Sequence, residues 1–177
     1  QPERAIWQSA LATYLRTYLA QNMWRIAQRT RTDDTASGDF RTWDAQRFVD
    51  TTRALYLASL APAAALQAES TDRWTDILIK GVDTEGLRPT MYDLLAHRAL
   101  DFFTTDVASL PAASDAFELT DPAALGDARS FAALVFAGPD GDQLIAALGV
   151  LQELTRFHMK DGDPDAGIDL ELVRLAF

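Results

Sequence analysis

Apolar residues recur at three- and four-residue steps along most of the chain, the pattern of helices with one apolar face. The longest such stretch runs from Glu3 to about Gln28. We expect it to form one long helix whose apolar stripe faces the core. The stripe consists of Trp7, Leu11, Tyr14, Leu15, Tyr18 and Leu19, prolonged by Asn22 and Ile26.

A second helix is predicted to start near Thr42, a good capping residue, and to stop at Pro62. Asp44 falls in its first turn, where the helix dipole favours a negative charge. Its predicted buried side consists of Phe48, Thr52, Leu55, Tyr56 and Leu60. Two short helices should follow, one over residues 63–69 and one capped by residues 70–72 and ending at Gly81.

The strongest helical pattern covers residues 91–103 and opens at Thr90, with Pro89 keeping Arg88 extended. Residues 105–141 are the least regular part and hold 6 of the 16 Gly and Pro residues. We interpret them as a packed connection, with one helical turn near Pro122. Residues 129–136 could form a short extended segment or a buried helical turn.

Asp142 is predicted to cap a long helix that ends near Met159. A tight turn at 160–163 then leads into a last helix, with Asp163 as its cap and Pro164 in its first turn. We expect this helix to bury Ile168, Leu172 and Leu175. Two helices joined by so short a turn run antiparallel, so the chain should end in a helical hairpin.

Together these patterns predict an all-α fold of successive antiparallel helical hairpins, packed as a tetratricopeptide-like array. We expect one helical domain over residues 1–177. It would comprise a helical array over 1–104, the packed connection over 105–141 and the C-terminal hairpin over 142–177.

The composition excludes several kinds of functional site and several kinds of partner. The chain has 177 residues, no cysteine and a formal charge of −10. Without cysteine there is no disulfide scaffold, thiolate zinc site, iron–sulfur cluster or cysteine nucleophile. The acidic balance argues against nucleic acid and anionic membranes as partners. There is no apolar run of 18 residues, so we expect no membrane-inserting segment. A chain that starts at Gln1 predicts a fragment of a longer polypeptide.

Nothing in the sequence forms a recognisable catalytic or metal-binding constellation. The two histidines, His97 and His158, stand alone within predicted helices, so we expect structural roles for both. His158, near a helix end, is suited to bond a free carbonyl oxygen. The nucleophile-elbow, phosphate-loop, dinucleotide and zinc-protease motifs are all missing. We therefore predict no enzyme activity, no cofactor and no catalytic or metal site.

The aspartates that begin at Asp161 imitate a helix–loop–helix calcium site in part. The match fails at the sixth position, which requires glycine and holds Ala166. It fails again at the twelfth, where Leu172 stands and Glu171 comes one residue early. We interpret this stretch as a capped turn between helices.

Aromatic residues offer an alternative role. Helical spacing favours core positions for them, but they could instead line a groove that binds a sugar or a peptide. The set comprises Trp7, Trp24, Trp43, Trp74, Tyr14, Tyr18, Tyr56 and Tyr92.

Three stretches carry a family resemblance: residues 24–30 followed by 40–44, residues 87–103, and residues 151–160 with 165–166 and 175–177. The second, LRPTMYDLLAHRALDFF, is the most specific. Together they resemble the helical region near the N-terminus of the very large alpha-2-macroglobulin-like proteins of Bacteroidetes.

The resemblance implies an exported chain, in the periplasm or cell envelope, belonging to a protein that traps proteases. This stretch lacks the cysteine of the family's thioester. The implied role is a non-enzymatic scaffold or interaction module. Its partners would be other domains of the same polypeptide or another envelope protein. The alternative is an envelope glycan- or peptide-binding helical domain that uses exposed aromatic residues.

Overall fold

The computed structural model describes residues 2–29, 38–79, 81, 86–104, 117–160 and 164–176. In these ranges the chain forms seven α-helices and three short 3-10 helices, and no β-strand. A single isolated bridge pairs Ser70 with Thr90. The predicted all-α class is confirmed, whereas the finer arrangement as a tetratricopeptide-like array stays a prediction.

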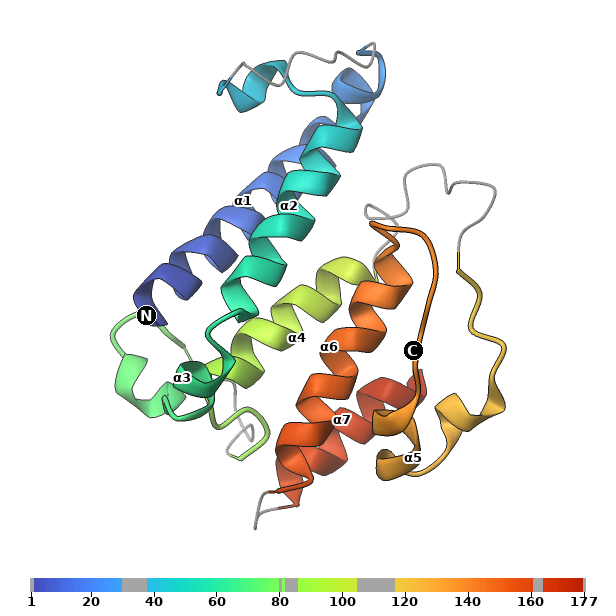
Figure 1. Ribbon diagram of the computed structural model, residues 1–177. Helices are drawn as coiled ribbons and strands as arrows, with labels where there is room; N and C mark the ends of the chain where they lie inside the picture. The colour runs from blue at the N-terminus through green and yellow to red at the C-terminus, as the bar shows by residue number, and fades with distance from the viewer. Residues whose placement is uncertain are drawn as a thin grey trace.

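The first two helices, α1 (Pro2–Ala27) and α2 (Ala45–Leu60), pack side by side, and α2 runs back along α1 (Figure 1). The cap of α2 is Asp44, whose side chain accepts a hydrogen bond from the Arg47 amide. Thr42 instead ends a 3-10 helix, Phe40–Thr42, so the predicted start lay two residues early. Asp44 is the more favourable N-cap residue for α2, because its carboxylate also interacts with the positive end of the helix dipole.

The buried face of α1 agrees with the predicted one at Leu15, Leu19 and Ile26 but differs from it in the first half of the helix. Trp7, Leu11 and Tyr14 are exposed, and Trp7 keeps 73% of its surface in solvent. The face that packs inward starts with small residues and continues with larger ones: Ala5, Ser9, Ala12, Leu15, Leu19 and Ile26. Small side chains let α2 come close, which large rings at the same positions would prevent.

At the centre of the molecule lies α4 (Met91–Phe103), which contacts α1, α2, α6 and the short helix α3 (Ala63–Gln67). Thr90 caps α4 as predicted, and its side-chain oxygen accepts a hydrogen bond from the Asp93 amide. The Asp93 side chain accepts a hydrogen bond from the Thr90 amide, which completes a capping box. Before it, Ser70 caps the 3-10 helix Thr71–Trp74.

A polar network fixes the α1–α2 pair on α4. The hydroxyl oxygens of Thr13 on α1 and Tyr56 on α2 lie 3.0 Å apart. Arg98 on α4 donates to the same Thr13 hydroxyl at 2.7 Å. Three helices therefore share one partly buried hydrogen-bonded point.

The described part of the predicted connection packs on α6 (Gln143–His158). It contains the 3-10 helix Pro122–Leu125 and α5 (Ala128–Ala133). Of residues 129–136, for which the sequence allowed either an extended segment or a helical turn, those up to Ala133 are helical. The Gln152 side chain on α6 donates to the carbonyls of Phe131 and Leu134. Residues 105–116 lie outside the described ranges.

The last helix, α7 (Asp165–Ala176), packs on α6, which Asp142 caps as predicted. Its predicted buried residues are exposed: Ile168, Leu172 and Leu175 face solvent. Ala166, Leu170 and Arg174 are buried instead. Arg174 donates to the carbonyls of Ala124 and Gly126, and these bonds turn α7 so that its other face points outward. Of the predicted turn at 160–163, residues 161–163, which include the Asp163 cap, lie outside the described residues.

Candidate functional site

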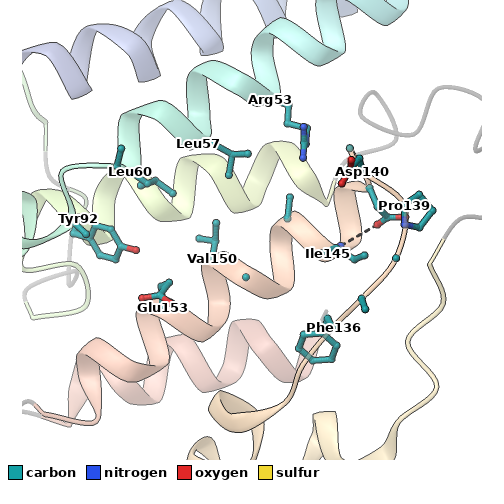
Figure 2. A pocket seen from close by; sticks show the side chains of 18 residues that line it. Arg53, Leu57, Leu60, Tyr92, Phe136, Pro139, Asp140, Ile145, Val150 and Glu153 are labelled. Atoms are coloured by element: carbon teal, nitrogen blue, oxygen red, sulfur yellow. Dashed lines mark hydrogen bonds between the residues drawn. The ribbon is translucent and has the colours of Figure 1, made fainter.

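A cleft of about 670 Å³ separates α2 from α6 (Figure 2). Both helices pack on α4, which holds them apart. The α2 wall presents Arg53, Leu57 and Leu60, and the α6 wall presents Ile145, Val150 and Glu153. Tyr92, in the first turn of α4, lines the cleft near Leu60 and Glu153, and the loop 136–142 borders the other end.

Small residues and a fixed loop shape this cleft. A Cβ atom added at Gly149 on α6 would meet nothing within 4 Å, so the helix backbone itself borders open space. A Cβ at Gly138 would lie 2.6 Å from Ile145 Cδ1, which shows how closely the loop approaches α6. Asp142 fixes the loop, because one carboxylate oxygen accepts from the Ile145 amide and the other from the Phe117 amide.

The polar groups of the cleft lie towards its two ends. Arg53 Nε is buried without a hydrogen-bond partner, and Figure 2 places Arg53 at the same end as Asp140. At the other end, burial and then the charge of Glu153 raise the pKa of Tyr92 to about 12. Glu153 itself pairs with Arg156 at 2.7 Å. The middle is apolar, so the cleft combines an apolar centre with ionic ends.

The two histidines lie near one another, beside the junction of α4, α6 and α7. His158 Nε2 lies 2.9 Å from Asp93 Oδ1, and both side chains are buried. The position of His158 near a helix end predicts a bond to a carbonyl oxygen, but the buried side chain of Asp93 lies within reach and is its partner instead. The two residues are 65 positions apart, and no local signal in the sequence pairs them.

His97 lies one helical turn after Asp93 and lines a separate cavity of about 300 Å³ with Arg88, Leu100 and Asp101 among its neighbours. Burial and then the positive charge of Arg88 lower the pKa of His97 to about 4, so its imidazole is neutral at pH 7. On the facing helix α7, Asp169 Oδ2 is buried without a hydrogen-bond partner.

This region offers little to a metal ion. Within the described ranges, no group of three or more His, Asp or Glu residues is placed to hold one. Of the residues that imitate a calcium loop, Asp161 and Asp163 lie outside those ranges. Glu171 lies within α7 and pairs with Arg174.

The aromatic residues divide between the interior and the surface. Tyr56 and Tyr92 are buried, and Tyr18, Trp43 and Trp74 are partly buried against the core. Trp7, Tyr14 and Trp24 are exposed, all of them on α1. The expectation that helical spacing places these rings in the core is therefore wrong for these three, whereas Tyr18, also on α1, packs against the core.

The chain matches no protein-family model, and it has no significant similarity to a curated protein or to a solved structure.

Proposed function

We propose that this chain is a non-enzymatic interaction module that holds a segment of a partner polypeptide in the cleft between α2 and α6. The cleft carries the proposal because it is open, largely apolar in its middle and bordered by fixed elements. Its volume of about 670 Å³ falls in the range of ligand pockets. Apolar side chains of a bound segment would enter the middle, and its polar groups would face the ionic ends.

A non-enzymatic role is supported by how the buried titratable groups are used. The Asp93 carboxylate bonds His158 with one oxygen and the first turn of α4 with the other. Both side chains are shielded from solvent, so neither reaches a substrate in the cleft. The cleft itself offers no histidine as a general base.

The parent protein of this module is proposed to be an exported, protease-trapping polypeptide of the alpha-2-macroglobulin type. The support is the resemblance of residues 87–103 and the two flanking stretches to the helical region of such proteins. The helices would then form successive hairpins in a tetratricopeptide-like array. Their partners would be other domains of the same polypeptide or another protein of the periplasm or envelope.

The test is retention of a partner from envelope extracts on the immobilised chain. Gly149→Trp fills the cleft, because a side chain there projects into open space. Gln21→Trp adds the same ring to the exposed face of α1 and serves as the control. We expect the wild type and the control to retain the same protein and Gly149→Trp to lose it. Retention of nothing, or equal retention by all three, overturns the proposal.

A second candidate is a glycan- or peptide-binding domain that uses exposed aromatic rings. Trp7 and Trp24 favour it, because they are 73% and 79% exposed. Stacking of a sugar on an indole ring changes its fluorescence. Titration of the chain with envelope oligosaccharides should then shift the emission, and Trp7→Ala with Trp24→Ala should abolish the shift. An unchanged emission spectrum in the wild type rejects this candidate.

A further inference from the structure

One end of the cleft presents a hydrogen-bond donor that the chain itself does not use. Arg53 lies on α2, and its side chain points from that helix towards the space between α2 and α6 (Figure 2). Its Nε atom is buried and has no hydrogen-bond partner among the described residues. A buried donor without an acceptor costs free energy, so this end of the cleft suits a ligand that brings an acceptor.

The acid at the same end does not fill this role. Asp140 belongs to the loop 136–142 and lies near Arg53 in the cleft (Figure 2). No hydrogen bond or ion pair joins the two side chains in the described part of the chain. Asp140 is exposed, so water can satisfy its oxygens, and the Arg53 donor stays available to a ligand.

A carboxylate is the acceptor that fits a guanidinium best. The two groups form two parallel hydrogen bonds, and such a pair is stronger where water is excluded. Leu57, one turn further along α2, and Ile145 on α6 provide apolar surroundings at this end. A carboxylate on Arg53 would therefore lie beside side chains that shield it from solvent.

The loop at this end favours a chain terminus over a side chain from the middle of a segment. Gly138 approaches α6 so closely that a Cβ atom there would lie 2.6 Å from Ile145 Cδ1. A peptide that follows the cleft meets this loop just beyond Arg53 (Figure 2). A segment whose last residue reaches Arg53 ends before the loop, whereas a longer one has to turn out into solvent.

The length of the cleft limits how many residues it can hold. From Arg53 to Leu60 the α2 wall extends over two helical turns, which is about 11 Å. An extended peptide advances about 3.3 Å per residue, so about three residues fill this length. Leu57 and Leu60 on one wall and Val150 on the other would contact their side chains, which should therefore be apolar.

We propose that the cleft binds the C-terminus of a partner polypeptide, with the terminal carboxylate on Arg53 and about three apolar residues beside Leu57, Leu60 and Val150. This inference rests on the function proposed for the cleft and adds the chemistry of the ligand. The net charge of −10 opposes acidic peptides in general. The cleft therefore selects one terminal carboxylate with apolar neighbours and not an acidic stretch.

Binding of matched peptide pools to the immobilised chain tests the proposal. Both pools are acetylated at the N-terminus and draw their last three positions from alanine, valine, leucine and phenylalanine. One pool ends in a carboxylate and the other in an amide. We expect the wild type to bind the carboxylate pool at least about tenfold more tightly than the amide pool. Equal binding of the two pools, or binding of neither, overturns the proposal.

A third pool distinguishes a terminal carboxylate from that of a side chain. It carries the same three positions, followed by a glutamate and a glycine–serine tail that ends in an amide. We expect it to bind no more tightly than the amide pool, because the loop beyond Arg53 obstructs a chain that continues. Binding equal to that of the carboxylate pool contradicts recognition of a terminus.

Two arginine variants locate the carboxylate. Arg53→Gln should lower the affinity for the carboxylate pool to that for the amide pool. Arg4→Gln removes the same charge from the exposed face of α1 and should leave the tenfold preference unchanged. Circular dichroism confirms that both variants are folded. A preference that survives in Arg53→Gln contradicts the proposal.

Gly149→Trp separates this proposal from the function proposed for the cleft. If the wild type binds the carboxylate and amide pools equally and Gly149→Trp binds neither, the cleft holds peptides and only the carboxylate proposal fails. If Gly149→Trp binds both pools as the wild type does, the peptides do not occupy the cleft and both proposals fail.

Discussion

His158 Nε2 lies 2.9 Å from Asp93 Oδ1, and this contact joins the last turn of α6 to the first turn of α4. The His158 side chain is 4% exposed and that of Asp93 is fully buried. The second Asp93 oxygen accepts bonds from the amide and the hydroxyl of Thr90. One carboxylate therefore stabilises a helix start and a helix end at the same time.

Removal of one partner of this pair should be costly. In His158→Ala, the buried Asp93 Oδ1 atom loses its imidazole partner, and we expect the free energy of unfolding to fall by about 1–3 kcal/mol. Urea denaturation measures the change. The control is Arg41→Ala, which breaks the exposed pair with Asp39 and should leave the free energy of unfolding nearly unchanged. Equal losses in the two variants would show that the buried contact contributes no more than a surface pair.

The neutral His97 predicts a dependence of stability on pH. Its pKa is about 4 in the folded chain and 6.5 in the reference state, so the folded chain binds the proton more weakly. The contribution of His97 is fully present above pH 6.5 and is lost as the pH falls towards 4, by up to about 1.4 kcal/mol per pH unit. His97→Gln should therefore show a shallower loss of stability than the wild type over this range. Denaturation midpoints at several pH values measure both slopes, and parallel slopes would contradict the prediction.

Tyr92 should lose its phenol proton only at high pH. Burial and Glu153 raise its pKa to about 12 from 10.0, so its phenol keeps its proton while exposed tyrosines lose theirs. Its contribution to stability is fully present below pH 10 and is lost as the pH rises towards 12. Absorbance of tyrosinate during an alkaline titration should show a late component that Tyr92→Phe removes. Tyr14→Phe, at an exposed position, should leave this late component in place.

The orientation of α1 can be tested with two neighbouring positions. Ala12 is fully buried, so Ala12→Leu forces an extra branched side chain into the core and should cost about 1–3 kcal/mol. Leu11 is half exposed, and Leu11→Ala should change stability by only about 0.5 kcal/mol. Thermal or urea unfolding distinguishes the two. The reverse order of effects would mean that the aromatic row packs on the core.

Arg174 should fix the connection between α4 and α6 in place. Its guanidinium lies 4.9 Å from the centre of the Phe131 ring and donates to two carbonyls of the 3-10 region. Arg174→Met leaves these acceptors without partners, and we expect a loss of about 3 kcal/mol. Hydrogen exchange should quicken first at residues 124–134. Arg73→Met, at an exposed pair with Glu69, is the matched control and should leave that exchange unchanged.

Local signals in the sequence were sufficient for the helices and most of their starts. Thr90 and Asp142 cap α4 and α6 as predicted, because a cap needs only its own next three residues. Which face of a helix is buried depends on its neighbours. On α1, hydrophobicity favours the row with Trp7, but close approach to α2 favours the row with Ala5, Ser9 and Ala12.

The candidate site could not be read from the sequence for the same reason. The cleft exists because α2 and α6 both pack on α4. The helical patterns of these three segments in the sequence do not indicate how far apart α2 and α6 lie. The orientation of α7 depends on Arg174 and on carbonyls about fifty residues earlier. A lone arginine in an amphipathic helix is usually expected at the surface, so its burial gives no advance signal.

The hydrogen-bonded point shared by Thr13, Tyr56 and Arg98 joins the α1–α2 pair to the central helix. Leu57, on the cleft wall, directly follows Tyr56. The width of the cleft therefore depends in part on three polar side chains that do not line it.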